Sequence, residues 1–153
     1  MHGFKDNKDR AWVLQLDAPA AKRMKALAAA DIQDAIKGGE TNLIVRLDND
    51  PCLLVEALYA ALKPAIDALG LTPEDFAAGL GGCIDGAADA MREEIIDFFP
   101  RSRRAMLRAE VDKMKEATAA VVEKLKSLSL DSLLNSLPSS VSPPTAIPSE
   151  SCT

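Results

Sequence analysis

The first sixteen residues show a two-residue alternation of apolar and polar positions. Trp12, Leu14 and Leu16 alternate with Val13 and Gln15, and the preceding segment 6–9 (Asp-Asn-Lys-Asp) has the composition of a tight turn. This pattern predicts a β-hairpin over residues 4–16. Because an isolated two-stranded hairpin is only marginally stable in water, we expect it to pack on helices, with Trp12 as its anchor.

The following segments change to helical spacing. Residues 19–30 predict a first helix with Pro19 in its first turn, and Gly38-Gly39 then interrupts the pattern. The short apolar segment 43–45 is compatible with either a strand or a helix. A helix is predicted from the Asp50-Pro51 cap to Gly70, with a kink at Pro64. Its apolar stripe contains Leu53, Leu54, Ala57, Leu58, Ala61, Leu62, Ala65, Ile66 and Leu69.

Two further helices follow closely along the chain. Thr72-Pro73 with Asp75 is a capping box, and Leu71 is placed to pack on Phe76, so a short helix is predicted up to Gly81-Gly82. The next helix is predicted to end at Pro100. Its inward-facing residues are Ile84, Ala87, Ala88, Met91, Ile95, Phe98 and Phe99.

A long helix is predicted from Ser102 to about Leu128, because apolar residues recur alternately four and three positions apart. This heptad pattern is interrupted by the polar Thr118. We interpret six of its residues as a candidate partner-binding seam: Leu107, Val111, Met114, Val121, Leu125 and Leu128. The alternatives are that the seam packs on the protein's own domain or pairs with a second copy.

Composition supports a mainly α fold, a small helical bundle with an N-terminal β-hairpin, a long C-terminal helix and a disordered tail. Hydrophobic residues make up 48% of the 153 positions but aromatic residues only 4%, which favours closely packed Ala/Leu helices over sheets. The expected divisions are a hairpin (1–17), a helical core (18–100), a long helix with a weakly amphipathic extension (101–137) and a disordered Ser/Pro-rich tail (138–153).

Charge and cysteine content narrow the function classes. The net charge of −5 argues against binding of nucleic acid, and no apolar run is long enough to cross a bilayer. The first residues lack the apolar core of a secretory signal, so we expect none. Three widely spaced cysteines fit neither a disulfide framework nor a zinc site and point to a reducing compartment.

An acidic strip is the second candidate partner-binding feature. Asp85, Asp89, Glu93 and Asp97 lie four residues apart on one predicted helix, where like charges repel by about 0.2–0.5 kcal/mol per pair. The strip could dock a basic partner or hold a cation. The alternative, which we favour, is a solvated face compensated by the nearby arginines 101, 103, 104 and 108.

Catalytic chemistry has little support in the sequence, and we expect no enzyme, cofactor or metal site. The one histidine, His2, is expected in a frayed terminus, so it could not complete a carboxylate cluster. Cys83 follows two glycines at a helix start but has no histidine to activate it, so we expect it to be a buried structural residue. Residues 79–82 lack the Lys-Ser/Thr of a phosphate loop.

Several of these motifs together resemble a known family. The Trp-containing hairpin, the Asp-Pro-capped helix, the segment 70–76 (Gly-Leu-Thr-Pro-Glu-Asp-Phe) and the segment 93–100 (Glu-Glu-Ile-Ile-Asp-Phe-Phe-Pro) are similar to small proteins of tailed-phage and prophage tail modules. The nearest functional class is the tail assembly chaperones. The resemblance covers about residues 4–115 and implies a small helical domain with an N-terminal β element.

The resemblance also implies a function and partners. Members of this class bind the apolar, helical tape measure protein in the host cytoplasm and bring tail tube subunits to it; some are made in a longer, frameshifted form. A structural or adaptor subunit retained in the virion is the alternative. A DNA-binding regulator is a third possibility, which depends on the cluster of arginines 101–104 alone.

Overall fold

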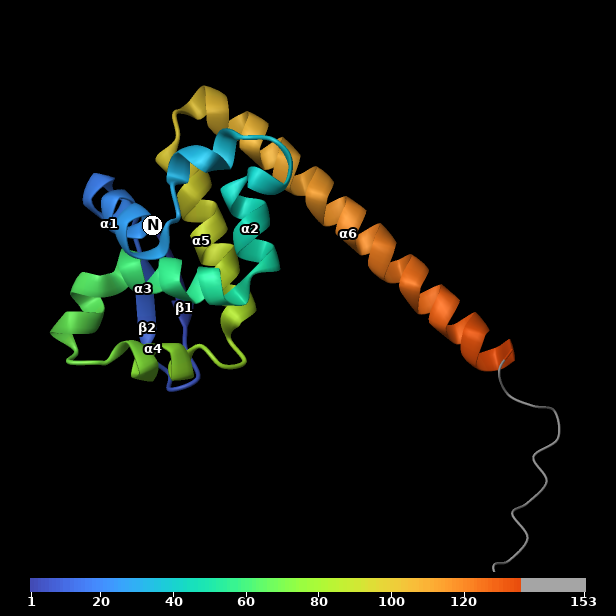
Figure 1. Ribbon diagram of the computed structural model, residues 1–153, viewed down its shortest axis with the longest axis horizontal. Coiled ribbons are helices and arrows are strands. Elements are labelled where there is room, and N and C mark those ends of the chain that lie inside the picture. The colour runs from blue at the N-terminus through green and yellow to red at the C-terminus, as the bar shows by residue number, and fades with distance from the viewer. Residues whose placement is uncertain (136–153) are drawn as a thin grey trace, which may run out of the picture. The chain divides into compact units, whose positions relative to one another are not determined.

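The computed structural model of the chain describes residues 1–135 and shows a mainly helical protein with an N-terminal hairpin (Figure 1). The fold class predicted from the sequence is confirmed for these residues; the tail predicted for 138–153 lies outside them. The chain divides into two compact units, Met1–Glu110 and Val111–Thr153, and this division falls inside the last helix. No helix in residues 1–135 combines the length and the apolar character that a membrane span requires.

The hairpin packs one face into the core, as the alternating pattern predicts. Strand β1 (His2–Lys5) pairs antiparallel with β2 (Ala11–Leu14), and Phe4 lies opposite Trp12. Phe4, Trp12 and Leu14 are buried, whereas the intervening Val13 is exposed. Trp12 contacts the ring of Phe76 edge-on at 5.3 Å between centroids. The predicted role of Trp12 as the anchor of the hairpin is therefore confirmed.

Helix α1 (Ala18–Ala28) packs on α3 (Pro51–Ala68), and both begin at an aspartate cap. Helix α1 begins and ends slightly earlier than predicted: Asp17 accepts a hydrogen bond from the Ala20 amide, and Ala29 adopts a left-handed conformation with φ of 50° that stops the helix. At the start of α3, the Asp50 carboxylate likewise accepts bonds from the amides of residues 52 and 53.

Helix α3 runs through Pro64 without interruption. Proline has no N–H to offer the carbonyl of Ala60 four residues earlier. The guanidinium of Arg23 on α1 provides this bond instead, with its Nε 3.0 Å from the Ala60 oxygen and its Nη2 3.1 Å from the Ala61 oxygen. The packing of α1 on α3 thus satisfies an acceptor that the proline leaves open.

The segment that the pattern left undecided is helical. Helix α2 (Leu43–Asn49) follows two short 3₁₀ turns, η1 (Ile32–Ile36) and η2 (Gly39–Thr41). The buried Asn42 side chain caps α2 by accepting from the Ile44 amide at 2.8 Å, and its amide donates to the carbonyls of residues 35 and 37. One polar side chain therefore closes the loop and starts the helix.

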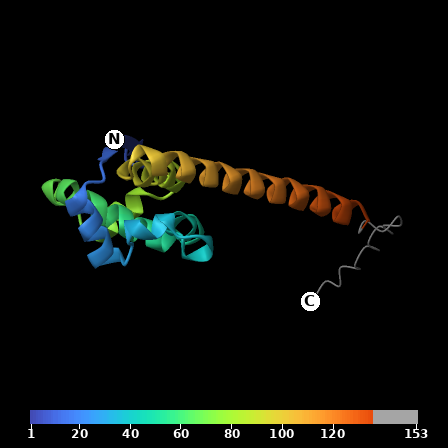
Figure 2. The ribbon, with the colours of Figure 1, turned by 90° about the horizontal axis from the view of Figure 1, so that it is seen from above.

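The remaining helices follow the predicted order. Helix α4 (Pro73–Gly79) begins with the predicted capping box of Thr72 and Asp75, and α5 (Ile84–Phe98) packs on strand β1. Helix α6 (Arg101–Asn135) is longer than the predicted 102–128 and is unbroken (Figure 2). Residues 129–135 contain no glycine or proline, so nothing in them stops propagation of the helix beyond Leu128.

Candidate protein-binding surface

The second half of α6 carries a row of exposed apolar side chains. Val121, Leu125 and Leu128 follow one another at the four- and three-residue steps of the heptad pattern, which places them on one face of the helix. Their side chains are 57%, 59% and 55% exposed. We call these three residues the α6 seam.

The other residues predicted for the seam lie in a different environment. Leu107 and Val111 are already buried in the chain, and Met114 is half-buried. The hydroxyl of Thr118, the polar residue of the pattern, donates a hydrogen bond to the Met114 carbonyl at 2.9 Å, so its donor has a partner within the same helix. Of the predicted seam, only the part beyond Thr118 therefore offers well-exposed apolar side chains to another molecule.

Exposure of the α6 seam to water is energetically unfavourable. Fully burying an exposed Val or Leu side chain contributes about 1.5–3 kcal/mol, and these three residues are a little over half exposed. Together they therefore represent about 3–5 kcal/mol of hydrophobic stabilisation not realised in the chain alone. Val122 is also exposed and borders the seam, whereas the exposed Leu130 and Leu134 lie toward the opposite face of α6 at about 100° per residue. Contiguous apolar surface of this kind is typical of protein interaction sites.

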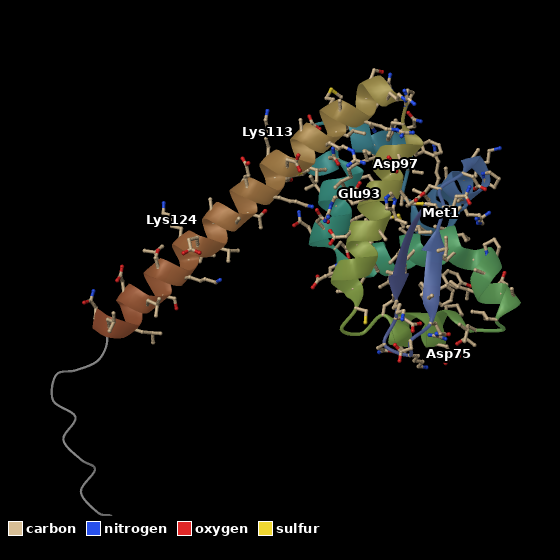
Figure 3. All side chains as sticks on the ribbon, turned by 180° about the vertical axis from the view of Figure 1, so that it is seen from behind. Met1, Asp75, Glu93, Asp97, Lys113 and Lys124 are labelled. Atoms are coloured by element: carbon tan, nitrogen blue, oxygen red, sulfur yellow. The ribbon has the colours of Figure 1, made fainter. Side chains whose placement is uncertain are left out.

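The acidic strip on α5 is largely paired with arginines of the same chain. Glu93 lies 3.0 Å from Arg108, and Asp97 lies 3.5 Å from both Arg104 and Arg108 (Figure 3). Asp89 pairs with Arg92. These pairs favour the compensated-face alternative over a docking strip.

The first two members of the strip, Asp85 and Asp89, differ in their surroundings. Arg92, which neutralises Asp89, lies 2.7 Å from Asp48 as well. Burial alone would lower the pKa of Arg92, but its two carboxylate partners raise that pKa above its ordinary value. Within residues 1–135, only Asp85 of the strip has no ion pair, and docking through it stays a prediction.

The arginine cluster has a structural role at one position. Arg104 donates to the carbonyls of Asp97 and Phe99 at 2.7 Å each, and so satisfies acceptors at the end of α5. Arg101 and Arg103 are exposed and have no ion pair within the described residues. The expectation that these arginines serve as intramolecular partners holds for Arg104 and Arg108.

His2 does not lie in a frayed terminus, and this expectation was wrong. It is part of β1, where its Nδ1 lies 3.0 Å from the buried Glu94 carboxylate of α5. Glu94 also accepts from the Leu16 amide at 3.0 Å and pairs with the Met1 amino group at 2.7 Å. Burial would raise the pKa of Glu94, but the Met1 amino group, the Leu16 amide and His2 lower it below its usual value.

Asp6 is a second buried carboxylate, and sequence reasoning assigned it only to a turn. Its side chain is 1% exposed and accepts four bonds: from the amides of Lys8 and Arg10, from Arg10 Nε at 2.6 Å and from Trp12 Nε1 at 3.0 Å. Burial would raise the pKa of Asp6, but these bonds, that of Trp12 foremost, lower it to about 2. The sequence signal that could have indicated this role of Asp6 is its spacing from the donors Arg10 and Trp12.

The turn of the hairpin is fastened to the end of α4. Asn7 donates from its side chain to the carbonyls of Ala78 and Gly81, and its amide donates to the Gly79 carbonyl at 2.9 Å. A Cβ atom at Gly79 would lie only 2.5 Å from Arg10 Nη2. That nitrogen is buried and has no hydrogen-bond partner within residues 1–135. The glycine therefore permits the close approach.

Residues suited to metal binding do not converge in the described part of the chain, and its two cysteines lie at helix starts. No group of three or more His, Cys, Asp or Glu side chains in residues 1–135 is placed to hold a metal ion. Cys83 stands at the helix start, as expected, but it is half-buried rather than buried, because it occupies the cap position before α5. Cys52 is exposed in the first turn of α3.

Comparison of the chain with protein-family models, with curated proteins and with solved structures finds no match. The α6 seam is therefore interpreted from its own geometry.

Proposed function

We propose that this chain is a binding protein that holds an apolar helix of another protein against the α6 seam. The observation that carries the proposal is the exposure of Val121, Leu125 and Leu128 on one helix face. The Met1–Glu110 unit contains a buried apolar core of its own. An amphipathic helix laid along the seam would bury these side chains at helical spacing.

The partner that we propose is the tape measure protein of a tailed phage, with the chain acting as a tail assembly chaperone in the host cytoplasm. Support comes from the motif resemblance of residues 4–115 and from the chemistry of the seam. A long, apolar helical protein stays soluble before assembly only if another protein binds its apolar face reversibly, and the exposed apolar side chains of the seam are suited to such binding. Recruitment of tail tube subunits is a further part of this proposal. The binding step breaks no covalent bond.

Co-expression with a tailed-phage tape measure protein tests the proposal. We expect the full chain to raise the soluble yield of the tape measure protein, and Leu125→Asp to abolish that gain because it places a charge in the seam. Leu69→Asp is the matched control, since Leu69 is 60% exposed outside α6. Equal soluble yields with and without the chain would contradict the chaperone function.

The alternative of a retained structural subunit makes an opposite prediction for purified particles. A transient chaperone leaves the assembly, so mass spectrometry of finished virions should find the chain at far below one copy per tail subunit. Abundant, stoichiometric copies would favour the structural or adaptor subunit instead.

A further inference from the structure

We propose that, in the absence of a partner, a second copy of the chain covers the α6 seam, with the two helices antiparallel. The heptad pattern places Val121 and Leu128 at d positions and Leu125 at an a position. In an antiparallel pair, a residues lie opposite d residues. Leu125 of each copy then contacts Leu128 of the other, and two-fold symmetry forms this contact twice.

Charge at the edge of the seam selects this register. Lys124 and Asp131 occupy successive g positions, which flank the seam. In antiparallel coiled coils g residues face g residues, so the register that pairs Leu125 with Leu128 also places Lys124 opposite Asp131 twice. If the register shifted by one heptad toward the N-terminus, Lys124 of one copy would lie opposite Lys124 of the other, and the two like charges would repel. Lys124, labelled in Figure 3, and Asp131 are both exposed. Neither forms an ion pair within residues 1–135, so both charges are available.

A parallel pair fits these residues less well. In register, Lys124 would face Ser129, which provides no opposite charge. The charge-complementary parallel pair, Glu110 with Lys115, flanks Val111, which is already buried in its own chain. Burial of Leu125 and Leu128 from each copy, with Val121 opposite Ser132, is set against the cost of association and suggests a dissociation constant on the order of 10–100 µM.

Sedimentation equilibrium of the full chain, from about 1 to about 500 µM at low salt, tests the inference. We expect a monomer–dimer equilibrium. Leu125→Ala should weaken dimerisation at least about a hundredfold, because each dimer loses two leucines. Leu69→Ala, outside α6, should leave it unchanged. The fluorescence of Trp12 verifies that the Met1–Glu110 unit of each variant is folded.

Charge exchange tests the orientation. Lys124→Asp should weaken the dimer about tenfold, and the double variant Lys124→Asp with Asp131→Lys should restore it to within about twofold. Lys126→Asp, with the same charge change two residues along, is the matched control and should have little effect. Equal effects at 124 and 126, failure of the double variant, or a monomer at all concentrations would overturn the inference.

The inferred dimer uses the same surface as the proposed function, but separate experiments test the two, so either can be wrong without the other. Dimerisation is measured on the pure chain, and partner binding by soluble yield in co-expression. A chain that stays monomeric but keeps the tape measure protein soluble overturns the dimer and leaves the chaperone function standing. A chain that dimerises as described but gives no gain in soluble yield has the opposite consequence.

Discussion

Replacing Asp6 by asparagine tests whether this buried carboxylate holds the hairpin to the helices. An asparagine has one acceptor oxygen in place of two, so in either orientation its NH₂ group faces donors, either the two amides or Arg10 Nε with Trp12 Nε1. Buried donors left without an acceptor cost about 1–3 kcal/mol each. We expect Asp6→Asn to lower the free energy of unfolding by about 2–4 kcal/mol at pH 7.

The pH dependence of this effect has a defined sign. The pKa of Asp6 is about 2 in the folded chain against 3.8 ordinarily. At about 1.4 kcal/mol per pKa unit, this difference stabilises the fold by about 2 kcal/mol. Because the folded pKa is the lower one, that stabilisation is complete above about pH 4. It decreases as the pH falls through 2, so the difference between wild type and variant should shrink there.

The single tryptophan provides the assay. Trp12 donates to Asp6, so its fluorescence during urea unfolding reports on this part of the molecule. Asp9→Asn is the matched control: Asp9 is an exposed acid of the same turn, and its φ of 58° suits asparagine. Equal free energies of unfolding for Asp6→Asn and Asp9→Asn, or a difference that is the same at pH 7 and pH 2, would contradict this role of Asp6.

Three further predictions concern stability and use the same unfolding assay. Gly79→Ala should cost about 1–3 kcal/mol, because its Cβ would displace Arg10 from Asp6, whereas Gly86→Ala, with open space around it in α5, should stabilise by about 0.5–1 kcal/mol; an equal sign for both would contradict this. Arg23→Ala should cost about 1–2 kcal/mol, and less in a Pro64→Ala background, where residue 64 regains the N–H that bonds to Ala60; strictly additive effects would refute the coupling. Glu94→Gln should lower the free energy of unfolding by about 2–4 kcal/mol at pH 7. The difference from wild type should decrease as the pH falls below 4.5, since the folded pKa of Glu94 lies below its ordinary value. A difference that does not depend on pH would argue against this role of Glu94.

Local features of the fold were predictable from the sequence because their physics acts within a few residues. The cap of α3 at Asp50 and the capping box at Thr72 join side chains to backbone amides two or three positions away. The role of Glu94 was not predictable in this way. Its partners lie 78 to 93 residues away in the chain, and no periodicity connects such distant positions.

The candidate surface was predictable only in part, for a related reason. Leu107 and Leu128 both occupy d positions of one heptad pattern, yet the first is 1% exposed and the second 55%. The spacing of apolar residues tells which face of a helix is apolar. Which stretch of that face the rest of the chain covers depends on tertiary packing, and the pattern does not contain it.

The position of the hairpin has a consequence for the order of folding during synthesis. Strand β1 leaves the ribosome before the helices that follow it, but it packs on α5, and Trp12 of β2 contacts Phe76. A hairpin of four-residue strands is not stable alone. The apolar face of the nascent hairpin therefore stays uncovered until α4 and α5 have emerged from the ribosome. Chains that stop before α5 should aggregate rather than fold.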